Sequence, residues 1–265
     1  MQKIVFNAHY LMYFDTAITD YWRALAMPYE ESMQQLEGDL YVVKATVEFH
    51  RSARMDDQID VGLRCSRVGN SSLTFTGAIF RGDEHLISGE LVYVFADPAT
   101  QTSRPVPQAF RDLLNGFEAG GAMLDVRTGD WAQLGTDAQR IRHQVCVQEQ
   151  GIPKDLEHDA ADALARHVVA YNRLGHAVAT GRLLPARNGE AQVGRLAVHR
   201  SLRGSGAGRQ VLAALQHAAR QQGVQTLMLH AQESAIGFYR RLGWQPRGEP
   251  FVEAGVRHVE MALPL

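Results

Sequence analysis

The chain has 265 residues, enough for one or two domains, and its 45% hydrophobic and 21% charged content is typical of a folded globular protein. A net charge of −2 excludes the overall basic field with which proteins hold nucleic acid or an anionic membrane. Its start lacks the apolar stretch of a signal peptide, no later run could span a bilayer, and cysteines occur only at 65 and 146. We therefore expect a cytoplasmic protein and not a secreted scaffold held together by disulfides.

Residues 1–97 predict one helix followed by antiparallel strands. Apolar residues at spacings of three and four precede Pro28 and predict an amphipathic helix with the buried stripe Leu11, Phe14, Ile18, Trp22 and Leu25. Period-two alternation with turn residues between the runs then predicts strands at 41–49, 59–65, 73–80 and 91–95. This order indicates an α+β domain.

Residues 98–122 break the pattern and are expected to be a linker. Three prolines precede a short helix candidate at 110–114, and three glycines occur between Gly116 and Gly121. Such a composition favours a flexible joint, so the domain boundary is placed here.

Residues 123–265 form a second α+β domain in which helices and strands alternate. A helix is expected at 138–149, and strands are expected at 167–171, 177–183 and 191–198. The next helix has its apolar face at 211–219 and ends near Gly223. A strand at 226–230, a helix at 234–242 and a strand at 258–263 complete the prediction.

A glycine-rich turn lies between the third of these strands and the helix that follows it. It reads Arg203-Gly204-Ser205-Gly206-Ala207-Gly208. Glycines let the backbone turn tightly and approach a ligand, and free N–H groups at a helix start favour an anion such as a pyrophosphate. The turn lacks the Lys of a Walker loop, and its last glycine follows too soon for a dinucleotide fingerprint. A surface loop without a ligand is the alternative.

The turn resembles the GNAT acetyltransferase signature, Arg/Gln-x-x-Gly-x-Gly/Ala, matched here by Arg203, Gly206 and Gly208. The resemblance continues in segments at 142–150, 157–159, 179–183, 194–198, 238–243 and 251–258, so it covers 123–265. It implies an acetyl-CoA-dependent N-acetyltransferase acting on a small-molecule or peptide amine that the sequence does not identify.

The same resemblance implies which residues hold the cosubstrate. Leu196, Ala197 and Val198 would lie along the pantetheine arm, while Arg203, Gly204, Ser205, Gly206, Ala207 and Gly208 would hold the pyrophosphate. Gln232 takes the place where the family often carries Asn, seven residues before its catalytic Tyr.

Two proton transfers define the implied catalytic residues. Tyr239 would protonate the leaving thiolate, since a phenol is neutral at pH 7; a core aromatic is the alternative. The amine must lose a proton, for which Glu149 is the first candidate general base and Glu253 the second. Structural carboxylates are the alternative for both.

The segment Asn7 to Asp15 resembles the start of the long helix in hotdog-fold acyl-CoA thioesterases of the 4-hydroxybenzoyl-CoA thioesterase type. Segments at 48–57 and 71–75 resemble later parts of that family. The resemblance implies a helix wrapped by a curved sheet, and a homodimer or larger oligomer that binds acyl-CoA at its interface. Asn7 and Tyr10 would border the thioester, and helix-start amides would polarise its carbonyl. For Asn7, a helix N-cap is the alternative.

One departure affects the activity expected of this hotdog domain. The family's catalytic Asp matches a position upstream of Met1, so either the true start lies further upstream or the domain lacks that carboxylate. Asp15 and Asp20 are not substitutes by position. Two hypotheses stay open. The chain is either a two-domain enzyme, an acetyltransferase fused to a thioesterase-like domain, in which both domains recognise CoA, or a transferase whose hotdog half is an inert dimerisation or acyl-CoA-binding module.

Eleven histidines raise the question of a metal site. His143, His158 and His167 are the densest group, but they show neither His-Glu-x-x-His nor a cysteine pair at zinc spacing. No metal is therefore expected.

Overall fold

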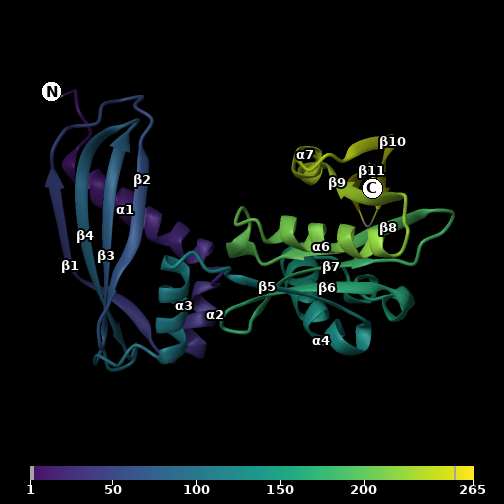
Figure 1. The fold of residues 1–265 in the computed structure, drawn as a ribbon, viewed down its shortest axis with the longest axis horizontal. Helices are drawn as coiled ribbons and strands as arrows, with labels where there is room; N and C mark the ends of the chain where they lie inside the picture. The colour runs from purple at the N-terminus through teal and green to yellow at the C-terminus, as the bar shows by residue number, and fades with distance from the viewer. Residues whose placement is uncertain (1–2, 254) are drawn as a thin grey trace. The chain divides into compact units, whose positions relative to one another are not determined.

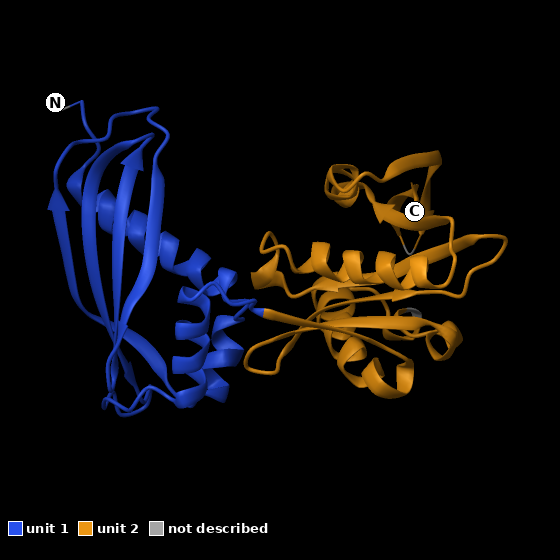
Figure 2. Ribbon diagram, in the orientation of Figure 1, with its two compact units in different colours: residues 1–123 blue, residues 124–265 orange. Residues whose placement is uncertain are grey.

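The structure, a computed structural model, describes residues 3–253 and 255–265; Met1 and Gln2 of the predicted first domain and Ala254 lie outside them. The chain divides into two compact units, Met1–Met123 and Leu124–Leu265 (Figure 2). Each combines helices with a largely antiparallel sheet, so the predicted α+β class is confirmed. No helix in the described ranges is long and apolar enough to cross a membrane.

Unit 1 is a long helix against a four-stranded antiparallel sheet, the expected hotdog arrangement (Figure 1). Its elements are α1 (Asn7–Ala24), α2 (Tyr29–Gln35), β1 (Asp39–Phe49), β2 (Asp60–Val68), β3 (Ser72–Arg81) and β4 (Glu84–Ala96). The strand order is β1-β4-β3-β2, which leaves β1 and β2 at the two edges.

Phe14 fixes how α1 lies on the sheet. Gly77 of β3 and Gly89 of β4 are directly paired, and a Cβ on either would come within 2.5 Å of the Phe14 ring. The two glycines therefore form the trough that holds this ring. Four residues of the predicted stripe are buried, but Leu11 is 41% exposed. The prediction for Leu11 was wrong, because Tyr10, four residues before Phe14, faces the sheet in its place.

Residues 98–122, expected to be a linker, contain the helix α3 (Gln108–Glu118). Phe110, Leu113 and Leu114 of this helix are buried. Glu118 accepts hydrogen bonds from the Tyr21 hydroxyl at 2.6 Å and from the Cys65 amide at 2.7 Å. These contacts join α3 to α1 and to the edge strand β2, and unit 1 extends to Met123.

Unit 2 has a seven-stranded sheet with helices on both faces, α4 on one and α6 on the other (Figure 1). Its strands are β5 (Leu124–Gly129), β6 (Arg166–Asn172), β7 (Ala177–Leu183), β8 (Glu190–Val198), β9 (Thr226–Gln232), β10 (Gln245–Glu253) and β11 (Val256–Pro264). The order is β10-β11-β9-β8-β7-β6-β5, and β8 with β9 is the parallel pair.

The helices of unit 2 include one unusual segment. The main helices are α4 (Trp131–Arg142), α5 (Lys154–Glu157), α6 (Ala207–Gln221) and α7 (Ile236–Arg241), with short 3-10 turns at Ala160–Leu164, Arg200–Leu202 and Glu233–Ala235. After α4 the chain continues as a π-helix, η1 (His143–Glu149). The helix predicted at 138–149 is thus helical throughout but changes its winding at His143. Such π segments are rare and frequently lie at functional sites.

The parallel strands β8 and β9 pair only at their beginnings. Their register runs from Glu190 with Thr226 to Gln192 with Met228, and they separate beyond these residues. On its other side β8 has a bulge, where Arg195 and Leu196 together oppose Gly181 of β7. Arg195 has φ 50°, the left-handed backbone that a bulge residue can adopt. The separation leaves the ends of β8 and β9 unpaired with each other.

Candidate active site

The glycine-rich turn has the backbone of an anion cradle. Gly204 has φ 86° and Gly206 has φ 91°, conformations in which a side chain would be strained. Helix α6 starts directly afterwards, at Ala207. The amides of Gly208 and Arg209, in its first turn, have no hydrogen-bond acceptor in the parts of the chain that the structure describes. A pyrophosphate placed there would receive these N–H groups and the positive end of the helix dipole.

Gly208 brings three predicted parts of the site together. A Cβ at this position would lie 3.2 Å from Cγ2 of Val198, at the end of β8, and 3.7 Å from Cζ of Phe238, in α7. The glycine therefore lets the start of α6 pack closely against both elements. It places the cradle beside the separated end of β8 and beside the helix that carries Tyr239.

Tyr239 is almost buried, with 8% of its surface exposed. Its ring meets Phe238 and Trp244 edge-on, with centroid distances of 5.1 and 6.0 Å. Burial raises the pKa of Tyr239 to about 12, so the phenol keeps its proton throughout the neutral range. It can donate a hydrogen bond to a leaving thiolate. Apolar surroundings also raise the pKa of the thiol, and this favours full transfer of the proton from the phenol to the sulfur.

Arg203 and Glu149, predicted for different tasks, contact each other. Nη1 and Nη2 of Arg203 donate to the two carboxylate oxygens of Glu149 at 2.6 and 2.7 Å. The hydrogen bonds from Arg203 lower the pKa of Glu149, and the charges of Arg200 and His199 act in the same direction. In this state Glu149 is a weak base, and the guanidinium already binds an anion.

The remaining predicted residues of unit 2 lie on both sides of the strand separation. Leu196 lies near Gly181, where a Cβ would come 3.3 Å from its Cδ1, and Ala197 is buried. Gln232 is the last residue of β9. Ser205 lies in the cradle, and its hydroxyl accepts a weak 3.4 Å hydrogen bond from Ala207. Glu253, near the end of β10, lies 2.9 Å from Nδ1 of His230 in β9.

A buried charged network lies where α4 becomes η1. Arg142 donates to Glu157 and to both carboxylate oxygens of Asp162, the latter at 2.9 Å. Arg182 of β7 donates to Asp162 at 2.7 Å and to Asp159 at 2.6 and 2.7 Å. Burial raises the pKa of Asp162, but the hydrogen bonds from the two arginines outweigh it and hold that pKa far below its usual range. Those from Arg182 lower the pKa of Asp159 to about 2.

Sequence reasoning missed this network, although signals for it were present. Arg182 stands in a strand whose residues are all buried, and Arg142 shares a helix face with Ala138, Ile141 and Val145. A charged residue on a buried face needs a buried partner, and the partners follow in the segment 157–162. The network connects the root of η1 to β7 and thereby fixes the base of the π-helix that ends at Glu149.

The two predicted residues of unit 1 are placed differently. Asn7 is exposed and is the first residue of α1, so it is not the N-cap; that position is Phe6, without a side-chain hydrogen bond. Tyr10 is buried, and its hydroxyl accepts a 2.9 Å hydrogen bond from the amide of Ala53. The polar end of Tyr10 is therefore already used in holding the loop between β1 and β2.

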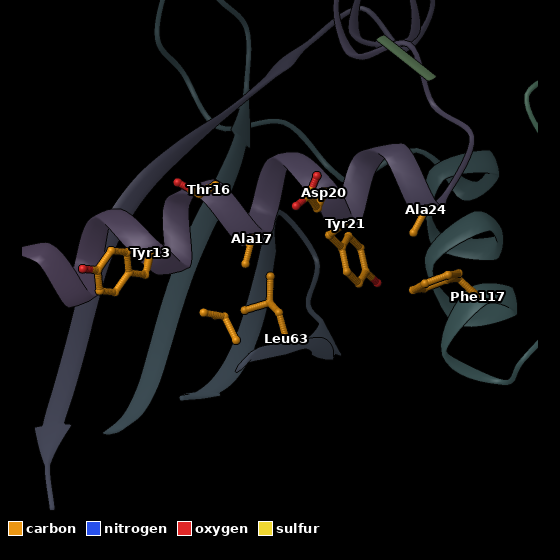
Figure 3. Close-up of a pocket in the computed structure, with 9 residues that line it drawn as sticks. Tyr13, Thr16, Ala17, Asp20, Tyr21, Ala24, Leu63 and Phe117 are labelled. Atoms are coloured by element: carbon orange, nitrogen blue, oxygen red, sulfur yellow. The ribbon is translucent and has the colours of Figure 1, made fainter. Parts of the chain in front are cut away.

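A pocket of about 390 Å³ lies elsewhere in unit 1, between α1 and the edge strand β2 (Figure 3). Its lining is mostly apolar, with Tyr13, Thr16 and Asp20 adding polar atoms from α1 and Phe117 entering from α3. Neither Asn7 nor Tyr10 lines it. Its volume falls in the range of small-ligand sites.

Cys65 and Cys146 are free thiols, and burial raises the pKa of each. Over residues 3–253 and 255–265, no three His, Cys, Asp or Glu side chains gather as metal ligands would.

Comparison with known proteins gives separate matches for the two units. A family model described as the acetyltransferase (GNAT) domain matches residues 139–265, and one described as the thioesterase superfamily matches residues 2–88. A Bacillus subtilis protein assigned as an acetyltransferase is 34% identical over 128 residues, covering 47% of this chain and 85% of the relative. The uncharacterized N-acetyltransferase YjcF of the same organism is 32% identical over 126 residues, covering 47% and 89%.

A solved structure agrees with these sequence matches. The crystal structure of a Lactobacillus plantarum protein assigned as an N-acetyltransferase superposes with a TM-score of 0.51 at 28% identity, covering 54% of this chain and 99% of that one. The chain therefore belongs to the GNAT family of acetyltransferases through its carboxy-terminal half, and it carries a thioesterase-superfamily domain of hotdog fold in its amino-terminal half.

Proposed function

We propose that unit 2 binds acetyl-CoA in the cradle at 203–208 and transfers its acetyl group to an amine. The observation that carries this proposal is the close packing at Gly208, which joins the end of β8, the start of α6 and the helix of Tyr239. A pyrophosphate at the free amides of the cradle would let a pantetheine arm run along Leu196, Ala197 and Val198 into the strand separation. The thioester would then lie toward Tyr239.

The chain's own groups account for both proton movements. The cosubstrate supplies an activated thioester: the amine nitrogen bonds to its carbonyl carbon as the bond from carbon to sulfur breaks. Tyr239 donates its phenolic hydrogen toward the sulfur as negative charge develops there. A carboxylate takes the proton that the amine nitrogen loses.

Two carboxylates are candidates for this base. Glu149 lies beside the cradle, bound to Arg203, and the low pKa that this contact causes weakens it as a base. Glu253 contacts His230 at 2.9 Å on the neighbouring strand, so an amine proton could also pass to the imidazole.

An acceptor screen tests this function. The intact protein is mixed with acetyl-CoA and a panel of polyamines, amino sugars, amino acids and peptides, and release of free thiol is measured. We expect at least one amine to accelerate thiol release severalfold, and Gly206→Asp to abolish the acceleration, since a carboxylate would enter the anion site. Equal thiol release by Gly206→Asp and the unchanged protein would contradict the proposal.

For unit 1 we propose a role in self-association and acyl-CoA binding. The edge strand β1 exposes Val42, Val43 and Phe49 at 50%, 60% and 56%, and its outer side pairs with no other strand among the described residues. A long apolar edge of this kind is a template for pairing with a second copy. The engaged Tyr10 and exposed Asn7 favour binding over hydrolysis.

The mass of the protein in solution and its hydrolysis of acyl-CoA thioesters test this role together. We expect a dimer by light scattering, and expect Val43→Lys to shift it toward monomer. Robust hydrolysis of an acyl-CoA by the chain would instead favour two enzymatic activities. A monomer that neither hydrolyses nor binds an acyl-CoA would contradict both readings of unit 1.

A further inference from the structure

Glu149 is bound to Arg203, the cation of the candidate pyrophosphate site. Glu149 accepts from both terminal nitrogens of the guanidinium at 2.6 and 2.7 Å, the fork with which arginine also binds phosphate. The two side chains are 28% and 45% exposed, so an incoming anion can reach them. A carboxylate thus sits on the group that a phosphate oxygen would use.

Both anions cannot hold this fork at once. Both terminal nitrogens of Arg203 are already paired with Glu149, and a phosphate beside its carboxylate would meet a like charge at short range. Glu149 is the last residue of η1, and the next helix, α5, begins only at Lys154. The carboxylate can therefore swing away while the root of η1 stays fixed by Arg142 and its buried partners.

We propose that Glu149 is an internal stand-in for the pyrophosphate, which displaces its carboxylate from Arg203 when the cosubstrate binds. The inference rests on the function proposed above. Acetyl-CoA must break this ion pair to enter the cradle, so Glu149 lowers the affinity of the empty site for its cosubstrate.

The charges around Glu149 support this competition for Arg203. Arg203, Arg200 and His199 face it, and the hydrogen bonds from Arg203 are the largest cause of its lowered pKa. Displacement removes those bonds and lets the pKa of Glu149 rise toward its ordinary value. Cys146, on the same π-helix, has a thiol pKa raised by burial and stays neutral.

Calorimetric titration with acetyl-CoA tests the proposal. Glu149→Gln removes the competing charge, so we expect its Kd for acetyl-CoA to fall roughly three- to fivefold, the scale of an exposed ion pair. Glu190→Gln is the matched control, because Glu190 makes a similar exposed bidentate pair with Arg247; it should leave the Kd unchanged.

A double-mutant cycle shows whether the effect passes through Arg203. Arg203→Gln should weaken binding, and adding Glu149→Gln to it should give no further gain. Weaker or unchanged binding by Glu149→Gln alone would overturn the proposal, since Glu149 would then orient Arg203 and not compete for it. A gain that persists fully in the Arg203→Gln background would overturn it as well. No binding by the unchanged protein would remove the proposed function and this inference with it.

Discussion

The candidate site of unit 2 is formed largely by backbone groups. In unit 1 the residues predicted for a site act through side chains, and these are either hydrogen-bonded within the fold or exposed to solvent. In unit 2 the positive φ of Gly204 and Gly206 and the close packing at Gly208 shape an open cradle. In unit 1 the hydroxyl of Tyr10 accepts from the Ala53 amide, and Asn7 is exposed and does not line the pocket between α1 and β2.

The difference teaches what each kind of site requires. A cradle of amides needs only glycines, a strand end and a helix start in the right order, and the fold itself supplies the ligand-binding groups. A thioester-hydrolysing site needs a carboxylate or activated water beside the carbonyl. The two carboxylates of α1, Asp15 and Asp20, are exposed.

The largest effect we expect is a loss of turnover in unit 2 without a loss of acetyl-CoA binding. Tyr239→Phe removes the proton donor but keeps the ring against Phe238 and Trp244. We expect kcat to fall by about 10²- to 10⁴-fold while the Kd for acetyl-CoA changes less than about twofold. Tyr171→Phe, which removes a hydroxyl bonded to Asp137 in the same unit, is the control and should leave kcat unchanged. A fall in affinity equal to the fall in kcat would mean that Tyr239 is a packing residue.

The second prediction concerns what holds each unit together. Arg142→Met leaves Asp162 and Glu157 buried without their main partner, so unit 2 should lose about 3–5 kcal/mol of stability. Arg140→Met, two residues earlier and in an exposed pair with Asp137, should cost less than about 0.5 kcal/mol. Urea unfolding of both variants measures the contrast. Equal small losses would show that the buried network does not support unit 2.

The matching test in unit 1 changes the packing around the Phe14 ring instead of a buried charge. Gly77→Ala places a methyl group within 2.5 Å of the Phe14 ring, and we expect a loss of about 1–3 kcal/mol. Gly62→Ala, on the neighbouring strand β2, meets nothing closer than 3.8 Å and should be nearly neutral. Combining Gly77→Ala with Phe14→Leu should cost less than the sum of the two. An additive double mutant would show that the trough does not hold the ring.

The smallest expected effect is a difference in acid sensitivity. Asp159 has a folded-state pKa of about 2 against an ordinary value of 3.8, so its contribution to stability is present above the ordinary value and is lost as the pH falls toward 2. Asp162, whose pKa is lowered further, acts in the same direction. The melting temperature of unit 2 should therefore drop more steeply between pH 4 and 2 than that of its Arg182→Met variant, because Arg182 donates hydrogen bonds to both carboxylates. Parallel pH profiles would contradict this.

Sequence patterns predicted the elements whose side chains alternate or repeat clearly. Helix α6, strand β7 and the cradle were found because apolar spacing and glycines directly encode them. Strand β10 was missed, since its Pro246, Gly248 and Pro250 resemble a loop and its residues are mostly exposed. Helix α2 was missed although Pro28, Glu30 and Glu31 are typical of a helix start.

The contacts between distant residues could not be read from one sequence. The pairing of Arg203 with Glu149 joins positions 54 residues apart and depends on where η1 ends relative to the start of α6. The Gly77 and Gly89 trough likewise depends on the register of β3 with β4. Residue spacing within a helix or strand predicts which side is buried. Which residues pack against that side is determined by the tertiary fold.

The central claim is that the turn at 203–208 binds the cosubstrate, and thermal unfolding with acetyl-CoA measures it most directly. At 100 times the Kd, the melting temperature of unit 2 should rise by about 5–10 °C. Gly206→Asp should abolish the rise. Gly223→Asp adds the same charge at a positive-φ glycine just past the other end of α6 and should retain it. No rise in the unchanged protein, or an equal rise in Gly206→Asp, would contradict the account.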